Sequence, residues 1–145
     1  MAYSGLYKPI NPKKYKGNPT RIIYRSLWER KFMVFCDHTS SIIEWGSEEV
    51  IIPYRSPIDG RIHRYYPDFY IKVLTKEGRL ARSIVEIKPK KQVKGPDPKP
   101  KRKTVAWKKS VMTFMKNKAK WDAAEDWCDD RRMKFMILTE DQLNV

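Results

Sequence analysis

Two segments decide the fold of this chain: Tyr65-Tyr66-Pro67-Asp68-Phe69-Tyr70-Ile71 and Ile84-Val85-Glu86-Ile87-Lys88. Both are rich in aromatic and β-branched residues, which favour strands. The polar stretch 75–79 between them has a glycine at its fourth position, which suits a short turn. The two segments therefore predict a β-hairpin.

Alternation along the two strands predicts how their side chains are sorted. Asp68 and Glu86 each lie nine residues from Glu77, at the centre of the turn, so they face each other across the hairpin. Lys88 falls on the same face as Glu86. The opposite face is apolar and comprises Pro67, Phe69, Ile71, Val85 and Ile87.

Two carboxylates at this distance repel each other, and burial would raise the pKa of at least one of them. A divalent cation removes the conflict. Oxygen ligands, with water and phosphate in the remaining positions, suit Mg²⁺, and we expect Mn²⁺ to substitute for it; the sequence has no Cys/His cluster at zinc spacing. Such an ion can activate a water and neutralise a phosphodiester, while Lys88 orients the water or stabilises the added charge. The alternative is an exposed hairpin face on which Asp68 pairs with Lys88.

The composition indicates a polyanionic partner. The chain has 145 residues, enough for one domain, and a formal net charge of +14. Nucleic acid explains such a surplus more readily than a membrane surface does. Because there is no apolar run of 18 residues and no signal peptide, we expect a soluble protein that stays in the compartment where it is made. Cys36 and Cys128 lie in apolar helical patterns and are expected to be reduced core residues.

The first residues differ in character from the rest. We predict an extended basic arm over residues 1–20, because prolines and glycines interrupt it too often for a helix, and a single domain over residues 21–145. The arm could lie on DNA or wrap the domain. Residues 42–47 are predicted to form a bend, and Glu49–Tyr54 a short strand.

A helix is predicted to begin at Ser26, because Ser26-Leu27-Trp28-Glu29 has the form of a capping box. Glu29 has two interpretations. In the first, it caps the helix by accepting a hydrogen bond from the backbone N–H of Ser26. In the second, it points towards Asp68 and either ligates the metal or positions a metal-bound water. Two further acids, Glu48 and Glu49, are expected to face solvent, and His63 is considered only as a phosphate contact.

A proline-rich basic loop without periodicity is predicted over residues 89–103. From Lys88 to Lys120 the chain holds thirteen Lys and Arg and one acid, a net charge of +12. Because this run starts at Lys88, we expect it to bind the phosphates of DNA. The expected DNA-binding residues are Lys90, Lys91, Lys94, Lys99, Lys101, Arg102, Lys103, Lys108 and Lys109.

A long helix is predicted from about Thr104 to Asp130, with an apolar stripe that packs on the sheet and lysines, including Lys120, on other faces. Residues 134–139 are predicted to be a strand buried on both faces. After a helical crossover this strand most naturally pairs in parallel. The expected fold is therefore α/β, a mixed sheet with helices packed against it.

Pro67-Asp68 followed by Glu86-Ile87-Lys88, with Glu29 on a preceding helix, resembles the PD-(D/E)xK nuclease superfamily. Trp28-Glu29, Pro67-Asp68 and Glu86-Ile87-Lys88-Pro89 also resemble, more weakly, the endonuclease subunit of heteromeric bacterial transposases. A closer resemblance, to the head completion nucleases of T-even-type tailed bacteriophages, covers nearly the whole chain and rests on five motifs. They are Met1-Ala2-Tyr3-Ser4-Gly5, Tyr24-Arg25-Ser26-Leu27-Trp28-Glu29, Trp45-Gly46-Ser47-Glu48-Glu49, Ile52-Pro53-Tyr54 and Val85-Glu86-Ile87-Lys88-Pro89-Lys90.

The resemblance implies a restriction-endonuclease-like αβββαβ core in which Asp68 and Glu86 ligate Mg²⁺, Lys88 assists the attacking water and Glu29 is the helical acid of the site. It implies a DNA endonuclease that acts after packaging, in the virion and the host cytoplasm, beside head or portal proteins and without a small-molecule cofactor. The alternative is a non-catalytic DNA-binding plug of the head. Sequence-specific cutting is not expected, because lysine suits phosphate contact better than base reading. The number of metals, the preferred DNA structure and the oligomeric state stay open.

Overall fold

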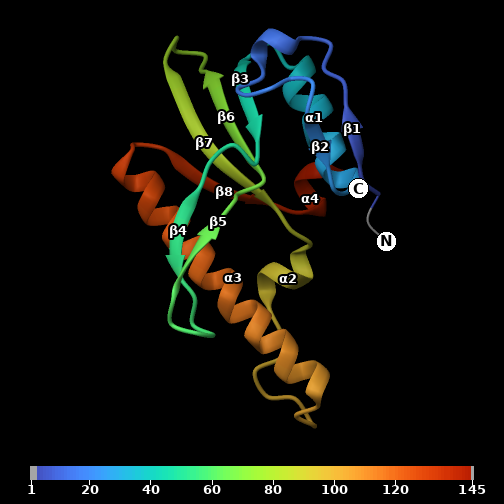
Figure 1. Cartoon of the computed structure of the whole chain (residues 1–145), viewed down its shortest axis with the longest axis vertical. Helices are drawn as coiled ribbons and strands as arrows, with labels where there is room; N and C mark the ends of the chain where they lie inside the picture. The colour runs from blue at the N-terminus through green and yellow to red at the C-terminus, as the bar shows by residue number, and fades with distance from the viewer. Residues whose placement is uncertain (1–2, 145) are drawn as a thin grey trace.

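The central feature of the computed structural model, which describes residues 3–144, is a four-stranded mixed sheet in the order β3-β6-β7-β8 (Figure 1). Its strands are β3 (Ile42–Ser47), β6 (Phe69–Leu74), β7 (Leu80–Ile87) and β8 (Lys134–Leu138). The first three are antiparallel, and β8 pairs with β7 in parallel, as predicted. With α1 (Leu27–His38) and α3 (Val105–Asp130), the order α1-β3-β6-β7-α3-β8 is the expected αβββαβ core.

Helices cover the two faces of this sheet. Phe69 and Val85 point into a core shared with Phe32 of α1 and with the N-terminal residues. Tyr70 and Ile84 point the other way, where they pack with Cys128 of α3. The face that carries Asp68 and Glu86 is therefore covered in part by α3. The alternation predicted for the hairpin is confirmed, but the end of the hairpin next to the two carboxylates is covered on both faces.

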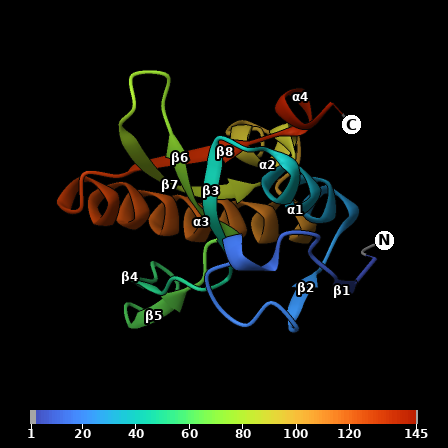
Figure 2. The same ribbon diagram turned by 90° about the horizontal axis from the view of Figure 1, so that it is seen from above.

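The structure contains a second hairpin that the sequence pattern does not predict. Strands β4 (Ile52–Arg55) and β5 (Ile62–Tyr65) form a separate antiparallel sheet, and Figure 2 shows it on the far side of α3 from the central sheet. The predicted strand 65–71 is wrong in extent, because Tyr65 ends β5 and β6 begins only at Phe69. Pro67 lies between the two strands. Because proline has no backbone N–H, it cannot donate a hydrogen bond to a neighbouring strand there.

Residues 42–47 are not a bend but the edge strand β3. The side chain of Trp45 is fully buried, with the ring of Tyr15 4.7 Å away and that of Phe69 6.5 Å away, so packing overrides the turn preference of Gly46-Ser47. The predicted strand Glu49–Tyr54 is shortened and moved to Ile52–Arg55. Strand β8 is half-buried rather than buried on both faces, because it is the other edge of the sheet.

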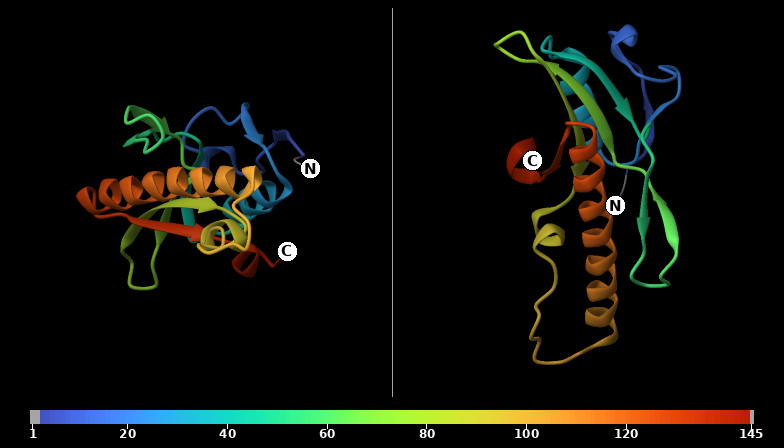
Figure 3. Two further views of the ribbon diagram at one scale, coloured as in Figure 1. Left: turned by 90° about the horizontal axis from the view of Figure 1, so that it is seen from below. Right: turned by 90° about the vertical axis from the view of Figure 1, so that its left-hand side faces the viewer.

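Both long helices begin where predicted. Ser26 caps α1 and Thr104 caps α3, each accepting a hydrogen bond from the backbone N–H three residues on. Only the C-terminal half of α3 is core, however: Trp121, Ala124 and Cys128 are buried. The N-terminal half extends beyond the central sheet, with the basic loop on one side and the β4–β5 hairpin on the other (Figure 3). The loop itself is not wholly irregular, because it contains the short helix α2 (Lys90–Lys94).

The described part of the first twenty residues wraps the domain. Strand β1 (Gly5–Tyr7) pairs with β2 (Ile22–Tyr24), and the 3-10 helix η1 (Pro12–Lys14) lies between them in the chain. Asp37 accepts hydrogen bonds from the Tyr7 hydroxyl and from the backbone N–H groups of Ile10 and Asn11. The ends of the predicted arm and domain, residues 1, 2 and 145, lie outside the described residues.

The C-terminal helix α4 (Glu140–Leu143) closes the chain against α1. Cys36 and Cys128 are free and buried, as predicted. No helix within residues 3–144 is long and apolar enough to cross a membrane.

Candidate active site

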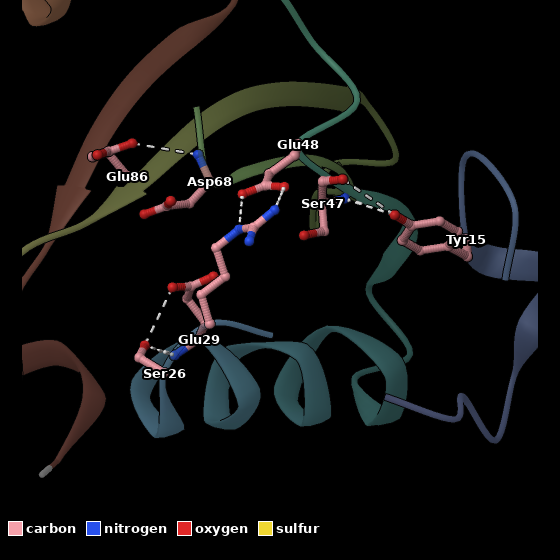
Figure 4. A network of polar contacts seen from close by, with 8 residues as sticks. Tyr15, Ser26, Glu29, Ser47, Glu48, Asp68 and Glu86 are labelled. Carbon is pink, nitrogen blue, oxygen red and sulfur yellow. Dashed lines mark hydrogen bonds and ion pairs between the residues drawn. The ribbon is translucent and has the colours of Figure 1, made fainter. Parts of the chain in front are cut away.

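Asp68 and Glu86 face each other at the end of the β6–β7 hairpin. The register pairs Phe69 with Val85, so the next pair outward is Asp68 and Glu86, as the turn position predicts. The backbone N–H of Asp68 donates to Glu86 Oε1 at 3.3 Å (Figure 4). In return, the N–H of Ile87 donates to Asp68 Oδ2 at 2.8 Å. The backbone of each strand thus holds the carboxylate of the other.

This pair of carboxylates is unfavourable as it stands. Burial, followed by the negative charge of Glu86, holds the pKa of Asp68 well above its usual value. Burial also raises the pKa of Glu86, although a hydrogen bond from Tyr65 and the charge of Lys88 oppose that rise. A cation between the two groups would remove the repulsion.

The donor set fits a hard divalent cation such as Mg²⁺. One oxygen of each carboxylate is held by N–H or O–H donors, whereas Asp68 Oδ1 and Glu86 Oε2 accept no hydrogen bond from any described residue. Within residues 3–144, no three His, Cys, Asp or Glu side chains converge as a ready-made metal cage. The remaining ligands would therefore come from water and phosphate, as in sites that hold Mg²⁺ by one or two carboxylates.

Tyr65 belongs to the site and was not singled out from the sequence. Its hydroxyl, at the end of β5, donates to Glu86 Oε1 at 2.7 Å. Burial and the neighbouring charge of Glu86 raise the pKa of Tyr65, so the phenol stays protonated and remains a donor. Because Tyr65 reaches Glu86 from a different sheet, strand alternation within one hairpin could not reveal the contact.

Two lysines flank the carboxylates. Lys88 Nζ lies 3.9 Å from Glu86 Oε2, and its side chain is 30% exposed. Lys120, on α3, lies over the rings of Tyr65 and Tyr54 at 5.6 and 5.9 Å. Burial and the charge of Lys116 lower the pKa of Lys120, while Glu86 acts in the opposite direction. The alternative considered for this face, an ion pair of Asp68 with Lys88, is not formed among the described residues, since Lys88 lies beside Glu86 instead.

Glu29 takes part in the N-terminal cap of α1, and its carboxylate also lies on the side of Asp68. Its backbone N–H donates to Ser26 Oγ at 3.2 Å, and its Oε2 lies 3.3 Å from the same hydroxyl. Among the hydrogen bonds of residues 3–144, none joins the Glu29 carboxylate to the Ser26 N–H, so only half of the capping box forms. Figure 4 shows the carboxylate of Glu29 directed from α1 towards Asp68. Burial raises the pKa of Glu29, and its charge contributes to the raised pKa of Asp68.

The other acids and His63 are held elsewhere. Glu48 accepts two hydrogen bonds from the guanidinium of Arg25, and Glu49 accepts one from the Tyr15 hydroxyl. Glu49 is exposed as expected, whereas Glu48 is only half-exposed. His63 lies 2.7 Å from Asp59, in the turn between β4 and β5.

The basic residues lie along α2, the following loop and the start of α3. Lys90 pairs with Asp141 at 3.1 Å and is thereby tied to α4. The other predicted DNA contacts form no ion pair within the described part of the chain. They are Lys91, Lys94, Lys99, Lys101, Arg102, Lys103, Lys108 and Lys109.

Comparison with known proteins shows the family to which the sequence is related. The sequence profile of a family described as TnsA-like endonuclease N terminal matches residues 39–140. That span includes Asp68, Glu86 and Lys120, whereas Glu29 precedes it. The head completion nuclease of Enterobacteria phage T4 is 42% identical over 149 aligned residues, which cover 100% of this chain and 96% of that protein. The resemblances drawn from the motifs are therefore confirmed. No solved structure shows a significant match.

Proposed function

The chain belongs to the family of TnsA-like endonuclease N-terminal domains, and we therefore propose that it is a DNA endonuclease with its active site at Asp68, Glu86 and Lys88. One observation carries the assignment of the site. The carboxylate of buried Glu86 faces that of half-buried Asp68, each with one oxygen free, beside a lysine that is partly open to solvent.

The metal ligands in this proposal are Asp68 Oδ1 and Glu86 Oε2, and Mg²⁺ is the expected ion, with Mn²⁺ as a substitute. When bound, such an ion supplies Lewis acidity and lowers the pKa of water, which suits phosphodiester hydrolysis. Glu29 is proposed as the helical acid of the site. Its carboxylate is half-buried and acts on the charge of Asp68, so it can add a ligand or orient a water.

The surrounding side chains hold the carboxylates and balance charge. Tyr65 and the N–H of Asp68 fix Glu86, and the N–H of Ile87 fixes Asp68. Lys88 and Lys120 place two positive charges at the same site. A phosphodiester under attack gains negative charge, and preorganised cations stabilise that charge in the transition state.

We extend the proposal to head completion, because the T4 relative is named for that process. The protein would act on packaged DNA in the virion or the host cytoplasm, beside head or portal proteins. The basic span 88–120, which has a net charge of +12, supports binding to the DNA backbone. The same charge also favours the second candidate, a DNA-binding plug without catalysis, since phosphate binding does not require the acids.

Plasmid cleavage with Mg²⁺ separates the two candidates. We expect Asp68→Asn and Glu86→Gln each to lower the nicking rate by about 10²-fold or more, the loss typical of removing one transition-state stabiliser. The control Glu77→Gln removes an exposed charge from the hairpin turn and leaves the rate unchanged. Absence of cleavage by the wild type, with DNA binding intact, would support the plug. Wild-type rates in both site variants would remove Asp68 and Glu86 from the active site.

A further inference from the structure

A cavity of about 590 Å³ lies between the basic loop and the N-terminal half of α3. Figure 3 shows the loop leaving α2, running beside α3 and returning to the start of that helix. The cavity is lined by Lys91 and Gln92 of α2 and by Trp107, Phe114 and Asn117 of α3. Its volume falls within the range of small-molecule and cofactor pockets.

The structure holds this cavity open. The indole N–H of Trp107 donates to the backbone oxygen of Asp97 at 2.7 Å, which fixes the far end of the loop to α3. Nearer to α2, Gly95 has a φ of +84°, and a Cβ there would lie 2.7 Å from the ring of Phe114. Glycine is therefore required both by the backbone conformation and by the close approach of the ring.

Asn117 indicates what kind of group the cavity would take. Its side chain is 8% exposed and lines the cavity, yet it forms no hydrogen bond with any residue between 3 and 144. Among the described residues, the buried polar side-chain atoms without a partner belong to Trp45 and Trp121, so the amide of Asn117 stays accessible from the cavity. There it offers both a donor and an acceptor. Together with the rings of Trp107 and Phe114, it suits a flat group with polar edges.

The position of the cavity relates it to the carboxylates. Asn117 precedes Lys120 by three residues, less than one turn of α3, and Lys91 follows Lys88 by three residues. A strand whose phosphate lies between Lys88 and Lys120 can therefore extend into the cavity. The net charge of +12 over residues 88–120 favours a polyanion over a protein partner.

We propose that the cavity receives the base of an unpaired nucleotide adjacent to the phosphate held at Asp68 and Glu86. This inference rests on the proposed function and adds a substrate class, DNA with unpaired nucleotides at an end or branch. Aromatic rings stack on bases, and amide side chains pair with base edges, so the lining matches this ligand. In a paired duplex the base is unavailable.

The test measures binding of end-labelled DNA by fluorescence anisotropy in EDTA. Three substrates share one duplex: a blunt end, a single-stranded overhang, and the same overhang without bases. We expect wild-type protein to bind the normal overhang at least about tenfold more tightly than the abasic one, as the loss of a stacked base implies. Phe114→Ala and Asn117→Ala should remove that preference and leave affinity for the blunt duplex unchanged.

Matched controls keep the result interpretable. Met112→Ala truncates an exposed side chain of α3 that does not line the cavity, and it should bind all three substrates as wild type does. In a second measurement, the overhang should quench tryptophan fluorescence in the wild type, and Trp107→Phe should remove most of that quenching. Circular dichroism confirms that each variant is folded.

Equal wild-type affinity for normal and abasic overhangs would overturn the inference. So would cavity variants that weaken blunt-duplex binding as strongly as overhang binding. Variants that bind every DNA normally but fail to complete phage heads would show a protein-binding site instead. Because binding is measured without metal, a protein that prefers unpaired bases but never cuts DNA would contradict the proposed function alone.

Discussion

The Tyr65 hydroxyl donates to Glu86 Oε1 at 2.7 Å across two different sheets. Tyr65 lies at the end of the small β4–β5 hairpin, and Glu86 lies in the central sheet. The hairpin therefore does more than cover α3, because it fixes one oxygen of Glu86. The other oxygen of Glu86, Oε2, lies on the side of Lys88.

Tyr65→Phe should move the pH dependence of cleavage. The hydrogen bond from Tyr65 lowers the pKa of Glu86, so its loss raises that pKa further. Because Glu86 must be ionised to hold a cation, the acidic limb of the kcat/KM profile should shift to higher pH. Tyr54→Phe, on the same small sheet, is the control and should keep the wild-type profile. An unchanged acidic limb in Tyr65→Phe would show that the contact does not tune the site.

Lys120→Gln should lower kcat by about 10²-fold, since it removes a cation placed beside the reacting phosphate. Lys120→Arg keeps the charge and should recover part of the rate. Lys118→Gln, an exposed position of the same helix, removes the same charge and should only raise KM. The measurement is steady-state cleavage over a range of DNA concentrations, which gives kcat and KM separately. If Lys120 only contributes to overall attraction, the Lys120 and Lys118 variants will behave alike.

Asp68→Asn should stabilise the metal-free protein at neutral pH. The pKa of Asp68 is raised in the folded state, so the folded protein holds a proton that the unfolded chain releases. The contribution of Asp68 to the free energy of unfolding is therefore fully present below pH 4 and is lost as pH rises through the raised pKa. The asparagine variant lacks this loss and gains about 1.4 kcal/mol for each unit of pKa shift removed.

Thermal unfolding in EDTA between pH 4 and 8 measures this difference. The gap in Tm between Asp68→Asn and wild type should widen as pH rises. The control Glu77→Gln, with the same loss of one carboxylate at an exposed site, should show a constant gap. A Tm for Asp68→Asn that stays below wild type at every pH would contradict the expected repulsion.

Divalent cations should raise the Tm of the wild type, because they bind the folded state and not the unfolded chain. Glu86→Gln should abolish most of the shift produced by Mg²⁺ or Mn²⁺. Glu29→Gln should reduce the shift without lowering the Tm in EDTA, because the cap of α1 uses the backbone N–H of Glu29 and the lost charge repels Asp68. Ser26→Ala should do the reverse and lower the Tm in EDTA, at a cost of about 1 kcal/mol. A full Mg²⁺ shift in Glu29→Gln would remove Glu29 from the metal site.

The sequence predicts contacts that depend on local periodicity and fails where distant elements meet. Asp68 and Glu86 could be paired because both lie at the same distance from one turn, and the side-chain period of a strand is two. The starts of α1 and α3 were predictable from Ser26 and Thr104, which act within one helical turn.

Contacts set by packing were not predictable. Tyr65 was assigned to the wrong strand, because nothing in its local pattern shows that β5 pairs with β4. Lys120 lies 34 residues from Glu86 along the chain, and its place at the site depends on how α3 crosses the sheet. Trp45 has a turn-like sequence after it, yet burial of its indole makes residues 42–47 a strand.

Helix α3 runs without interruption from Val105 to Asp130, with its C-terminal half in the core and its N-terminal half beside the basic loop. A continuous helix advances about 1.5 Å per residue, so its two halves cannot change their separation. If the cavity holds a base while the carboxylates hold a phosphate, the number of nucleotides between them is constant. Cleavage would then occur at a fixed distance from a DNA end or branch, measured by the length of a helix and independent of base sequence.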